Sequence, residues 1–420
     1  MRRQRPSFWL VMLYLLFEYV RPQTIYEALA GPPYARIIIL MALFAFVLER
    51  RPIRFGVVEG LLLLFALVVV ASSLGAFYPR LSVEWFPNFF PWLIIYVLIA
   101  NVVDTEDAFL VFVASFLLYS FKMSQFGTRS WAMSGFAFRS WGATGAPGFF
   151  QNSGEFGIQM CVFLPLIVAF IQALGHRWKK WQRWVAWAIA ATAVTGMVGS
   201  SSRGAILGGA AVGLWMLLRS RHKLRGFLIA ISLALVVFAI IPPEQKARLY
   251  AMGSDPTSLS RTTYWKHGLE MMRDYPILGI GFGNWTQYHM VLYGRGQLPH
   301  NIFIQAGSEL GVTGLLVFIA LIVSTFMINR DTRRLAQLIP ERGRFAWFMA
   351  HGLDGAMIGF LVSGFFVTVL YYPYFWINLA MTVALNTAAR SAAAPERTLV
   401  SGWRSLMSSR HGFTTLPAGR

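Results

Sequence analysis

His300 and Asn301 open an apolar run in the segment "QLPHNIFIQAGSELGVTG" (297–314), and further polar residues follow inside it. Gln305 and Glu309 come at four-residue spacing, which places them on one face of a helix. Polar side chains in hydrocarbon are costly unless they are paired or wet, so this face points into the protein. A histidine with an ordinary pKa of about 6.5 can take a proton from a hydroxyl near neutral pH. His300 is therefore a candidate general base with Asn301 or Glu309 as orienting partner; alternatively it only caps the helix or lies in the interface.

Two arginines occupy positions that favour an anionic partner. Arg203 stands between two apolar runs, in "VGSSSRGAILGG", and an unpaired arginine at bilayer depth costs about 2.5–3.5 kcal/mol. Arg261 lies in "LSRTTYWKHGLEMMRDYP" (259–276), a predicted short helix that Ser260 would cap. A cation in the first turn of a helix is locally unfavourable, which indicates a ligand or carboxylate beside it. Arg203 could instead snorkel to lipid headgroups.

The elements that must position these residues are membrane helices. The chain has 420 residues, is 56% hydrophobic and 13% charged, and contains apolar runs near the length of about 20 residues that spans a bilayer. Runs such as "GLLLLFALVVVASSLGAF" do not alternate, which excludes a β-barrel. We therefore expect an all-α polytopic membrane protein. Its twelve predicted spans lie near residues 8–20, 35–48, 57–76, 87–101, 108–121, 155–174, 184–199, 204–218, 226–242, 302–328, 345–369 and 374–388.

The positive charges predict the topology. The formal net charge is +19, and 24 of the 37 Lys and Arg fall on one side of the predicted bundle, together with both termini. The positive-inside rule makes that side cytoplasmic, so the charge indicates orientation and no nucleic-acid partner. The first helix lacks a small-residue cleavage site, and we expect it to be retained. We expect one transmembrane domain over 1–389 with outer loops at 122–154 and 243–300, and a cytoplasmic polar tail over 390–420.

Four short motifs, in this order, resemble the O-antigen ligase and polymerase superfamily, and most of all WaaL-type O-antigen ligases. The family pattern has a Ser-Arg step between spans, an arginine shortly before an aromatic in the large periplasmic loop, a glycine turn, and His-Asn followed by Glu and spaced glycines. The matching residues here are Ser202–Arg203, Arg261 with Tyr264 or Trp265, "GIGFGNW" (279–285), and His300–Asn301 with Glu309, Gly311 and Gly314. The resemblance is clearest over residues 145–315, and it implies a GT-C-like architecture of about twelve transmembrane helices.

The resemblance implies a bacterial inner-membrane glycosyltransferase with a periplasmic active site. Its donor would be a glycan on undecaprenyl diphosphate, and its acceptor a sugar hydroxyl of lipid A core, in lipopolysaccharide biosynthesis. Arg203 and Arg261 would bind the diphosphate, because the guanidinium fork matches phosphate oxygens. His300 would be the base for direct, inverting attack. Asn301, Glu309, Arg295 and Asn152 are further candidates for binding or orienting substrate.

Metal ions and cofactors are not expected. The predicted outer side has carboxylates but no Asp-x-Asp pair and no His/carboxylate cluster at ligand spacing, so the arginines would neutralise charge. The "GIGFGN" stretch is not a dinucleotide fingerprint because no strand–helix unit surrounds it, and we expect a turn there. The single Cys161 falls inside an apolar run, where it would pack as a small hydrophobe.

Two alternatives stay open. An O-antigen polymerase or a protein O-oligosaccharyltransferase would share the same architecture, because the acceptor is set by the shape of the cavity. A twelve-helix transporter or flippase would usually show two matching halves. We find no such correspondence between residues 1–210 and 211–420, and the candidate residues cluster at one face.

Overall fold

Each of the twelve predicted spans overlaps a helix in the structure, a computed structural model that describes residues 4–136, 142–220, 222–240, 246, 250 and 256–410. Within those residues the chain is helical and has no strand. The helices of the first half are α1 (Pro6–Tyr19), α2 (Tyr34–Leu48), α3 (Val57–Leu74), α4 (Pro79–Val102), α5 (Glu106–Met133), α6 (Ser153–Leu174), α7 (Lys180–Gly199), α8 (Arg203–Arg219) and α9 (Lys223–Ile240). The helices of the second half are α11 (Pro256–Asp274), α12 (Trp285–Tyr293), α13 (Ile302–Leu338), α14 (Pro340–Gly364) and α15 (Pro373–Arg410). Short 3-10 helices lie at Pro22–Thr24, Glu27–Leu29 and Gly175–Arg177.

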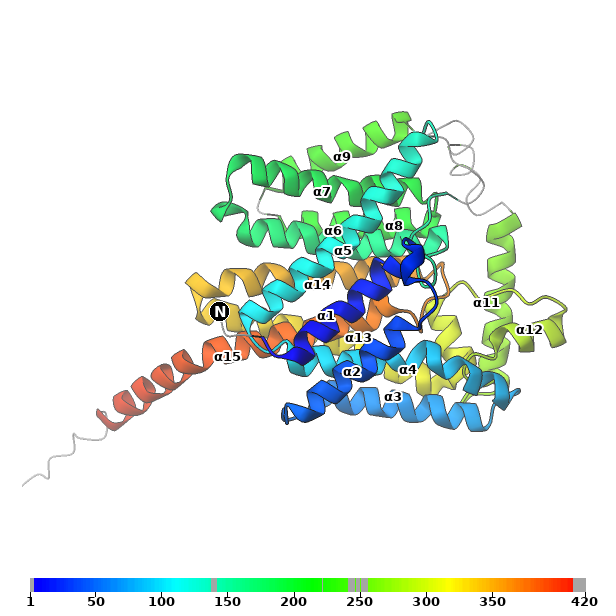
Figure 1. Cartoon of the computed structure of the whole chain (residues 1–420), viewed down its shortest axis with the longest axis horizontal. Coiled ribbons are helices and arrows are strands. Elements are labelled where there is room, and N and C mark those ends of the chain that lie inside the picture. The colour runs from blue at the N-terminus through cyan, green and yellow to red at the C-terminus, as the bar shows by residue number, and fades with distance from the viewer. Residues whose placement is uncertain are drawn as a thin grey trace, which may run out of the picture.

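Most helices run along one long axis, and α11 crosses one end of the bundle with α12 beside it (Figure 1). The N-terminus and the far end of α15 lie at the opposite end (Figure 1). Six helical stretches among the described residues are long and apolar enough to cross a membrane: Val57–Leu74, Pro79–Val102, Glu106–Met133, Ser153–Arg177, Ile302–Leu338 and Gly343–Gly364. The protein is therefore a multi-pass membrane protein, while the count of twelve spans and their orientation stay predictions.

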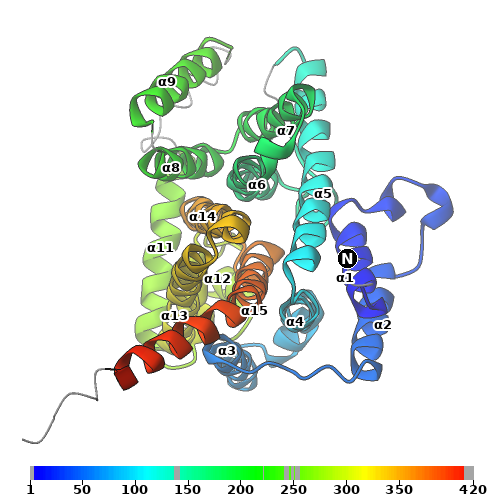
Figure 2. The same ribbon diagram turned by 90° about the vertical axis from the view of Figure 1, so that its left-hand side faces the viewer.

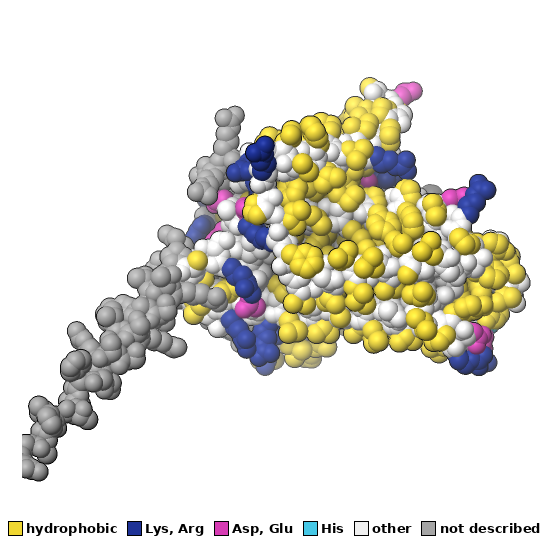
Figure 3. Space-filling view, turned by 90° about the horizontal axis from the view of Figure 1, so that it is seen from below, with side chains coloured by type: hydrophobic (Ala, Val, Ile, Leu, Met, Phe, Trp, Pro, Cys, Tyr) yellow, Lys and Arg dark blue, Asp and Glu magenta, His cyan; other side chains and the backbone are white. Residues whose placement is uncertain are grey.

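The surface agrees with a membrane setting. In the face seen in Figure 3, hydrophobic side chains cover a broad belt, and Lys and Arg gather toward the two ends. Apolar side chains on this kind of surface face lipid instead of a protein core; Leu40, Phe44 and Val47 of α2, for example, are each more than 60% exposed.

The interior is built around α6, α13, α14 and α15: α6 and α14 pack on α8, and α15 packs on α13, α4 and α5 (Figure 2). Glycines let α14 approach α6 closely: a Cβ at Gly352 would lie 2.6 Å from Ala169 Cβ, and one at Gly359 would lie 2.9 Å from the Cys161 carbonyl. Small residues at such contacts are the usual solution in membranes, where close packing replaces the hydrophobic drive. Cys161 is fully buried there, as predicted.

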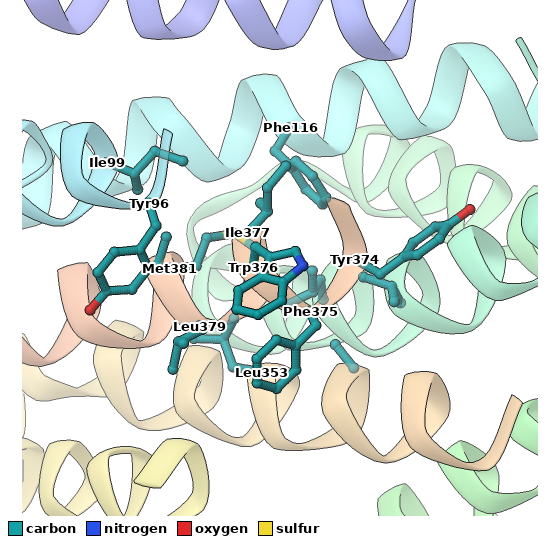
Figure 4. Packing of buried hydrophobic residues seen from close by; sticks show 14 of the residues in the cluster. Tyr96, Ile99, Phe116, Leu353, Tyr374, Phe375, Trp376, Ile377, Leu379 and Met381 are labelled. Atoms are coloured by element: carbon teal, nitrogen blue, oxygen red, sulfur yellow. The ribbon is translucent and has the colours of Figure 1, made fainter. Parts of the chain in front are cut away.

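The first turns of α15 close the core. Tyr374, Phe375, Trp376 and Ile377 pack against side chains from α4, α5 and α14 (Figure 4). Trp376 contacts Phe89 edge-on, with ring centroids 5.1 Å apart. The loop that precedes α15 is therefore anchored by a rigid helix start.

Several predicted helix boundaries are wrong, and four of them affect the predicted loops, the tail or the helices of the site. Helix α5 continues to Met133, so the first part of the predicted loop 122–154 is helical: Ser124 and Thr128 bond across to Thr192 and Thr195 of α7 at 2.7 Å each. Helix α15 continues through Arg410, so the tail predicted from residue 390 starts as helix.

The other two boundaries concern α11 and α14. Helix α11 begins at Pro256, so Ser260 does not cap it and Arg261 lies in its second turn, because a proline can occupy the first helical position. Helix α14 ends at Gly364, and residues 365–372 form a loop before Pro373. In the two predicted outer loops and the ninth predicted span, the residues outside the described ones are 137–141 of the first loop, 241–242 at the end of the span, and 243–245, 247–249 and 251–255 of the second loop.

Candidate active site

The loop between α14 and α15 (residues 365–372, called the α14–α15 loop) contacts every segment that carries a predicted site residue except that of Arg295. Its first contact is with His300: the His300 backbone N–H donates to Thr368 Oγ1 at 2.9 Å. His300 itself has φ +50°, a left-handed conformation that is uncommon for a residue with a side chain. Such a backbone persists only where the surroundings impose it, and it is typical of functional sites.

Arg261 and His300 interact electrostatically. Burial, and secondly the Arg261 guanidinium, lower the pKa of His300 to about 4. One turn further along α11, the Trp265 ring packs edge-on against Phe365 of the α14–α15 loop, with centroids 5.1 Å apart. Its indole N–H donates to the Pro299 carbonyl at 3.0 Å. The Arg261 charge therefore acts on His300, and His300 is neutral near pH 7 and able to accept a proton.

Arg203 begins α8 directly after its N-cap residue, Ser202, whose hydroxyl accepts from the Ala205 N–H at 3.3 Å. The next residue, Gly204, packs so tightly against the α14–α15 loop that a Cβ there would lie 3.0 Å from Phe366 Cβ. Phe366 is also the residue whose ring lies 6.4 Å from that of Trp265. The start of α8 and the Arg261 helix thus lie against the same loop residue.

Asn301 caps α13. Its side-chain Oδ1 accepts from the backbone N–H groups of Phe303 (2.8 Å) and Ile304 (3.1 Å), two donors that have no partner within the helix. Asn301 is 2% exposed, and its side-chain oxygen is used for capping the helix in this structure. It fixes the backbone that leads out of His300.

Gln305 and Glu309 point into the protein, as their spacing predicts. Glu309 is 3% exposed and accepts hydrogen bonds from the Tyr371 hydroxyl at 2.8 Å and the Trp285 backbone N–H at 3.2 Å, with Gln305 also donating to it. Gln305 Oε1 accepts from the Leu370 N–H at 3.3 Å. These two polar groups therefore connect α13 to the α14–α15 loop and to the start of α12.

The glycine stretch "GIGFGN" forms the predicted turn, and it docks on a break in α13. Gly311 has φ +69°, which interrupts the helical hydrogen bonds. The freed carbonyls of Ser308 and Glu309 accept from Ile280 and Gly281 at 2.9 and 3.1 Å. A Cβ at Gly279 would lie 2.4 Å from the Glu309 carbonyl carbon, so only glycine fits that approach.

The two remaining candidates lie further out. Asn152 precedes α6, and its side-chain amide donates to Glu155 Oε1 at 2.9 Å. The ring of Phe149, three residues before Asn152, packs edge-on against that of Tyr372 with centroids 5.0 Å apart, so this segment also reaches the α14–α15 loop. The Arg295 side chain is exposed, and its carbonyl accepts a hydrogen bond from His289.

Sequence reasoning missed Thr368, Tyr371 and Tyr372, because the segment "FVTVLYYP" reads as the end of one apolar span and the start of the next. The available signal was the Tyr-Tyr-Pro step, since proline does not continue a helix and two tyrosines at a span boundary need partners for their hydroxyls. Within the described residues, no group of three or more His, Cys, Asp or Glu could hold a metal ion; metal independence itself stays a prediction.

The fold and this cluster define a polytopic helical membrane protein in which α6, α8, α11 and α13 converge on one loop. Residues 188–319 match the Wzy_C family model, described as O-antigen ligase. The matched range includes Arg203, Arg261, His300, Asn301 and Glu309. This part of the chain is therefore similar to the O-antigen ligase family, whose members are membrane glycosyltransferase-like enzymes. A search of curated proteins found no match.

Proposed function

We propose that the protein is an O-antigen ligase, which transfers a preassembled glycan from undecaprenyl diphosphate to a sugar hydroxyl of lipid A core. The observation that carries this proposal is the α14–α15 loop: it contacts His300, the Arg261 helix and the start of α8 that holds Arg203. The match over residues 188–319 supports the reaction class. The active site would face the periplasm of a bacterial inner membrane, with both termini cytoplasmic.

Arg203 and Arg261 bind the diphosphate in this proposal. Charge-assisted hydrogen bonds contribute about 1.5–3 kcal/mol each, and they strengthen as the sugar–phosphate bond breaks and charge grows on the leaving group. The guanidinium groups stay charged at any relevant pH, so they can neutralise that charge without a metal ion.

His300 takes the proton of the acceptor hydroxyl as its oxygen attacks the anomeric carbon. Without donor, the Arg261 charge helps to lower the His300 pKa. A bound diphosphate offsets that charge, which raises the basicity of His300 when the donor is in place. Direct attack by one hydroxyl inverts the anomeric centre, and the diphosphate leaves with the bonding electron pair.

The test uses purified protein, undecaprenyl diphosphate-linked glycan and lipid A core oligosaccharide, with and without a chelator. We expect glycan on lipid A core, unchanged activity with chelator, and a loss of about a hundredfold or more for His300→Ala. Elongation of the glycan on its lipid carrier would instead identify a polymerase. Transfer to a protein acceptor would identify an O-oligosaccharyltransferase. Absence of any transfer in detergent would favour the alternative that the protein is a transporter or flippase.

A further inference from the structure

The segment that leads into His300 is held by ring nitrogens at every second residue. Trp285 Nε1 donates to the Gln297 carbonyl at 2.7 Å, and Trp265 Nε1 donates to the Pro299 carbonyl at 3.0 Å. His289 Nδ1 bonds the Arg295 carbonyl. The bonded carbonyls belong to residues 295, 297 and 299. In an extended chain, alternate residues point to the same side, which is the arrangement seen here. These three bonds fix a six-residue stretch that has no secondary structure of its own.

Two of the three donors sit in one packed aromatic cluster, and the third packs against the α14–α15 loop. Trp285 and His289 are one turn apart on α12, each 1% exposed, and their rings stack with centroids 5.7 Å apart. Trp265 comes from α11 and is braced by Phe365. Because each ring is wedged between others, its N–H has one direction in which to point. The 295–299 carbonyls are therefore bound by rigid donors.

The hydrogen bonds also fix the tautomers of two histidines when both rings are neutral. A carbonyl only accepts, so His289 Nδ1 carries its proton, and the Nε2 of the neutral ring is an acceptor. His267 Nδ1 lies 3.0 Å from that Nε2 and must donate to it. The His267 ring stacks on Tyr293 at 3.7 Å, and the Tyr293 hydroxyl donates to Glu270 Oε2 at 3.0 Å. His289 is thus oriented from its far side as well.

At the end of this segment, His300 adopts its left-handed backbone conformation and bonds Thr368. A left-handed histidine costs conformational energy, so the chain would relax if its approach were loose. Pinned carbonyls at 295, 297 and 299 prevent that relaxation.

We propose that Trp265, Trp285 and His289 are positioning residues, which hold the 295–299 backbone so that the His300 imidazole is fixed in its working orientation. The proposal rests on the proposed function for its catalytic consequence. Its structural content, the placement of His300, can be measured without any substrate.

The catalytic test replaces the indole donors one at a time, as Trp285→Phe and Trp265→Phe, which keep an aromatic ring and remove the N–H. The matched control is Trp215→Phe, because Trp215 Nε1 makes the same kind of bond, 3.1 Å to the His351 carbonyl, between α8 and α14. We expect kcat to fall about 10- to 100-fold in the first two variants, with the donor KM within about threefold. The control should keep its kcat. Equal kcat in all three, or a rise in KM with kcat unchanged, would overturn the proposal.

The substrate-free test follows the titration of His300 by NMR in protein with labelled histidine, assigned by comparison with His300→Ala. Burial of the His300 imidazole lowers its pKa, and the Arg261 charge lowers it further. Release of the segment exposes the imidazole, so its pKa should rise toward the ordinary value in Trp265→Phe and Trp285→Phe, and not in Trp215→Phe. If the His300 titration in both Trp265→Phe and Trp285→Phe is the same as in wild type, the positioning role is refuted, whatever reaction the protein catalyses. Conversely, shifted titration with no transferase activity in wild type would leave the positioning intact and reject the ligase function.

Discussion

Polar side chains gather in two regions of this membrane protein, and the two differ in what their hydrogen bonds hold. Around the α14–α15 loop, most bonds join a side chain to the backbone of a non-helical segment, as Thr368 does with His300 and Trp265 with Pro299. We call this region the loop cluster. Toward the opposite end of α13, side chains bond to side chains between regular helices; we call this region the helix seam. It consists of Asn329, Asp331, Thr332, Arg333, Asp354, Asn386 and Arg390.

The helix seam joins α13 to α14 and to α15. Asp354 of α14 is 1% exposed and accepts from Asn329 at 2.8 Å and from Arg333. Asn386 and Arg390 of α15 donate to Asp331 at 2.9 and 2.6 Å. Helices that pack in regular fashion need such bonds to satisfy buried charge and to fix their register. The loop cluster instead fixes irregular backbone, which is what a site with a defined geometry requires.

The strongest test of this difference is His300→Ala. Loss of a general base should lower kcat by about 10²–10⁴-fold, while the thermal midpoint stays near that of wild type, because the side chain supports catalysis and not packing. Initial rates of glycan transfer and a thermal unfolding scan of the same preparation measure both quantities. A variant that retains more than a tenth of the wild-type rate would remove His300 from the mechanism.

Arg261→Lys tests the anion site with the charge kept. Lysine cannot offer the paired N–H groups of a guanidinium, so donor affinity should weaken about tenfold. The control is Arg273→Lys on the same helix, where the arginine is exposed and pairs with Asp274 at 3.0 Å. Binding of the lipid-linked donor to detergent-solubilised protein gives both values. Equal affinities in the two variants would assign Arg261 to the surface.

The pH profile sharpens the link between Arg261 and His300. A base works in its neutral form, and a lowered pKa keeps His300 neutral as the pH falls to about 4. The acid limb of kcat/KM, which reports the free enzyme, should therefore lie well below pH 6. In Arg261→Gln the positive charge that helps to lower the pKa is gone, so the limb should move to higher pH. A limb at the same pH in both proteins contradicts an electrostatic interaction between Arg261 and His300.

Tyr371→Phe removes one donor from Glu309 in the loop cluster. A matched bond exists elsewhere: the Tyr96 hydroxyl donates to Glu59 at 2.8 Å, the same length as the Tyr371 bond. Each phenylalanine should cost about 1–2 kcal/mol of stability, because a carboxylate loses a hydrogen bond. Only Tyr371→Phe should also lower kcat, by about three- to tenfold, since its loop carries Thr368. Similar kcat in the two variants would mean that the loop does not position the base.

The helices could be predicted from sequence because apolar runs of bilayer length leave little choice of structure. The motif residues could be grouped for a related reason: the charge pattern placed Arg203, Arg261 and His300 on one side, and the Arg261 charge acts on His300 in the structure. The turn at "GIGFGN" followed from its glycines, three of which have positive φ. In each case a local property of the chain determined the result.

The rest depends on contacts between distant segments. Nothing local marks α5 as continuing past Lys122; its hydroxyl pairs with α7 support that continuation. Helix α12 was not predicted because its nine residues have no distinctive period, and Trp285 is fixed instead by Glu309, which lies 24 residues away in sequence. The α14–α15 loop was missed because its role is to touch α6, α8, α11 and α13. Such convergence is invisible until the helices are packed.

The smallest expected effect on activity comes from the helix seam. Asp354→Asn keeps the shape of the side chain but removes the charge that pairs with Arg333, leaving a cation that is only 13% exposed. The thermal midpoint should fall by several degrees, because a buried charge without its partner is costly. The kcat of the folded fraction should remain within about twofold of wild type, since no bond of the seam reaches the loop cluster directly.

Rates normalised to folded protein, taken below the unfolding transition, separate the effect on stability from the effect on kcat. A specific loss of kcat in Asp354→Asn would show that α13 transmits strain along its length, past the break at Gly311. The helix seam and the loop cluster would then not be separate in function.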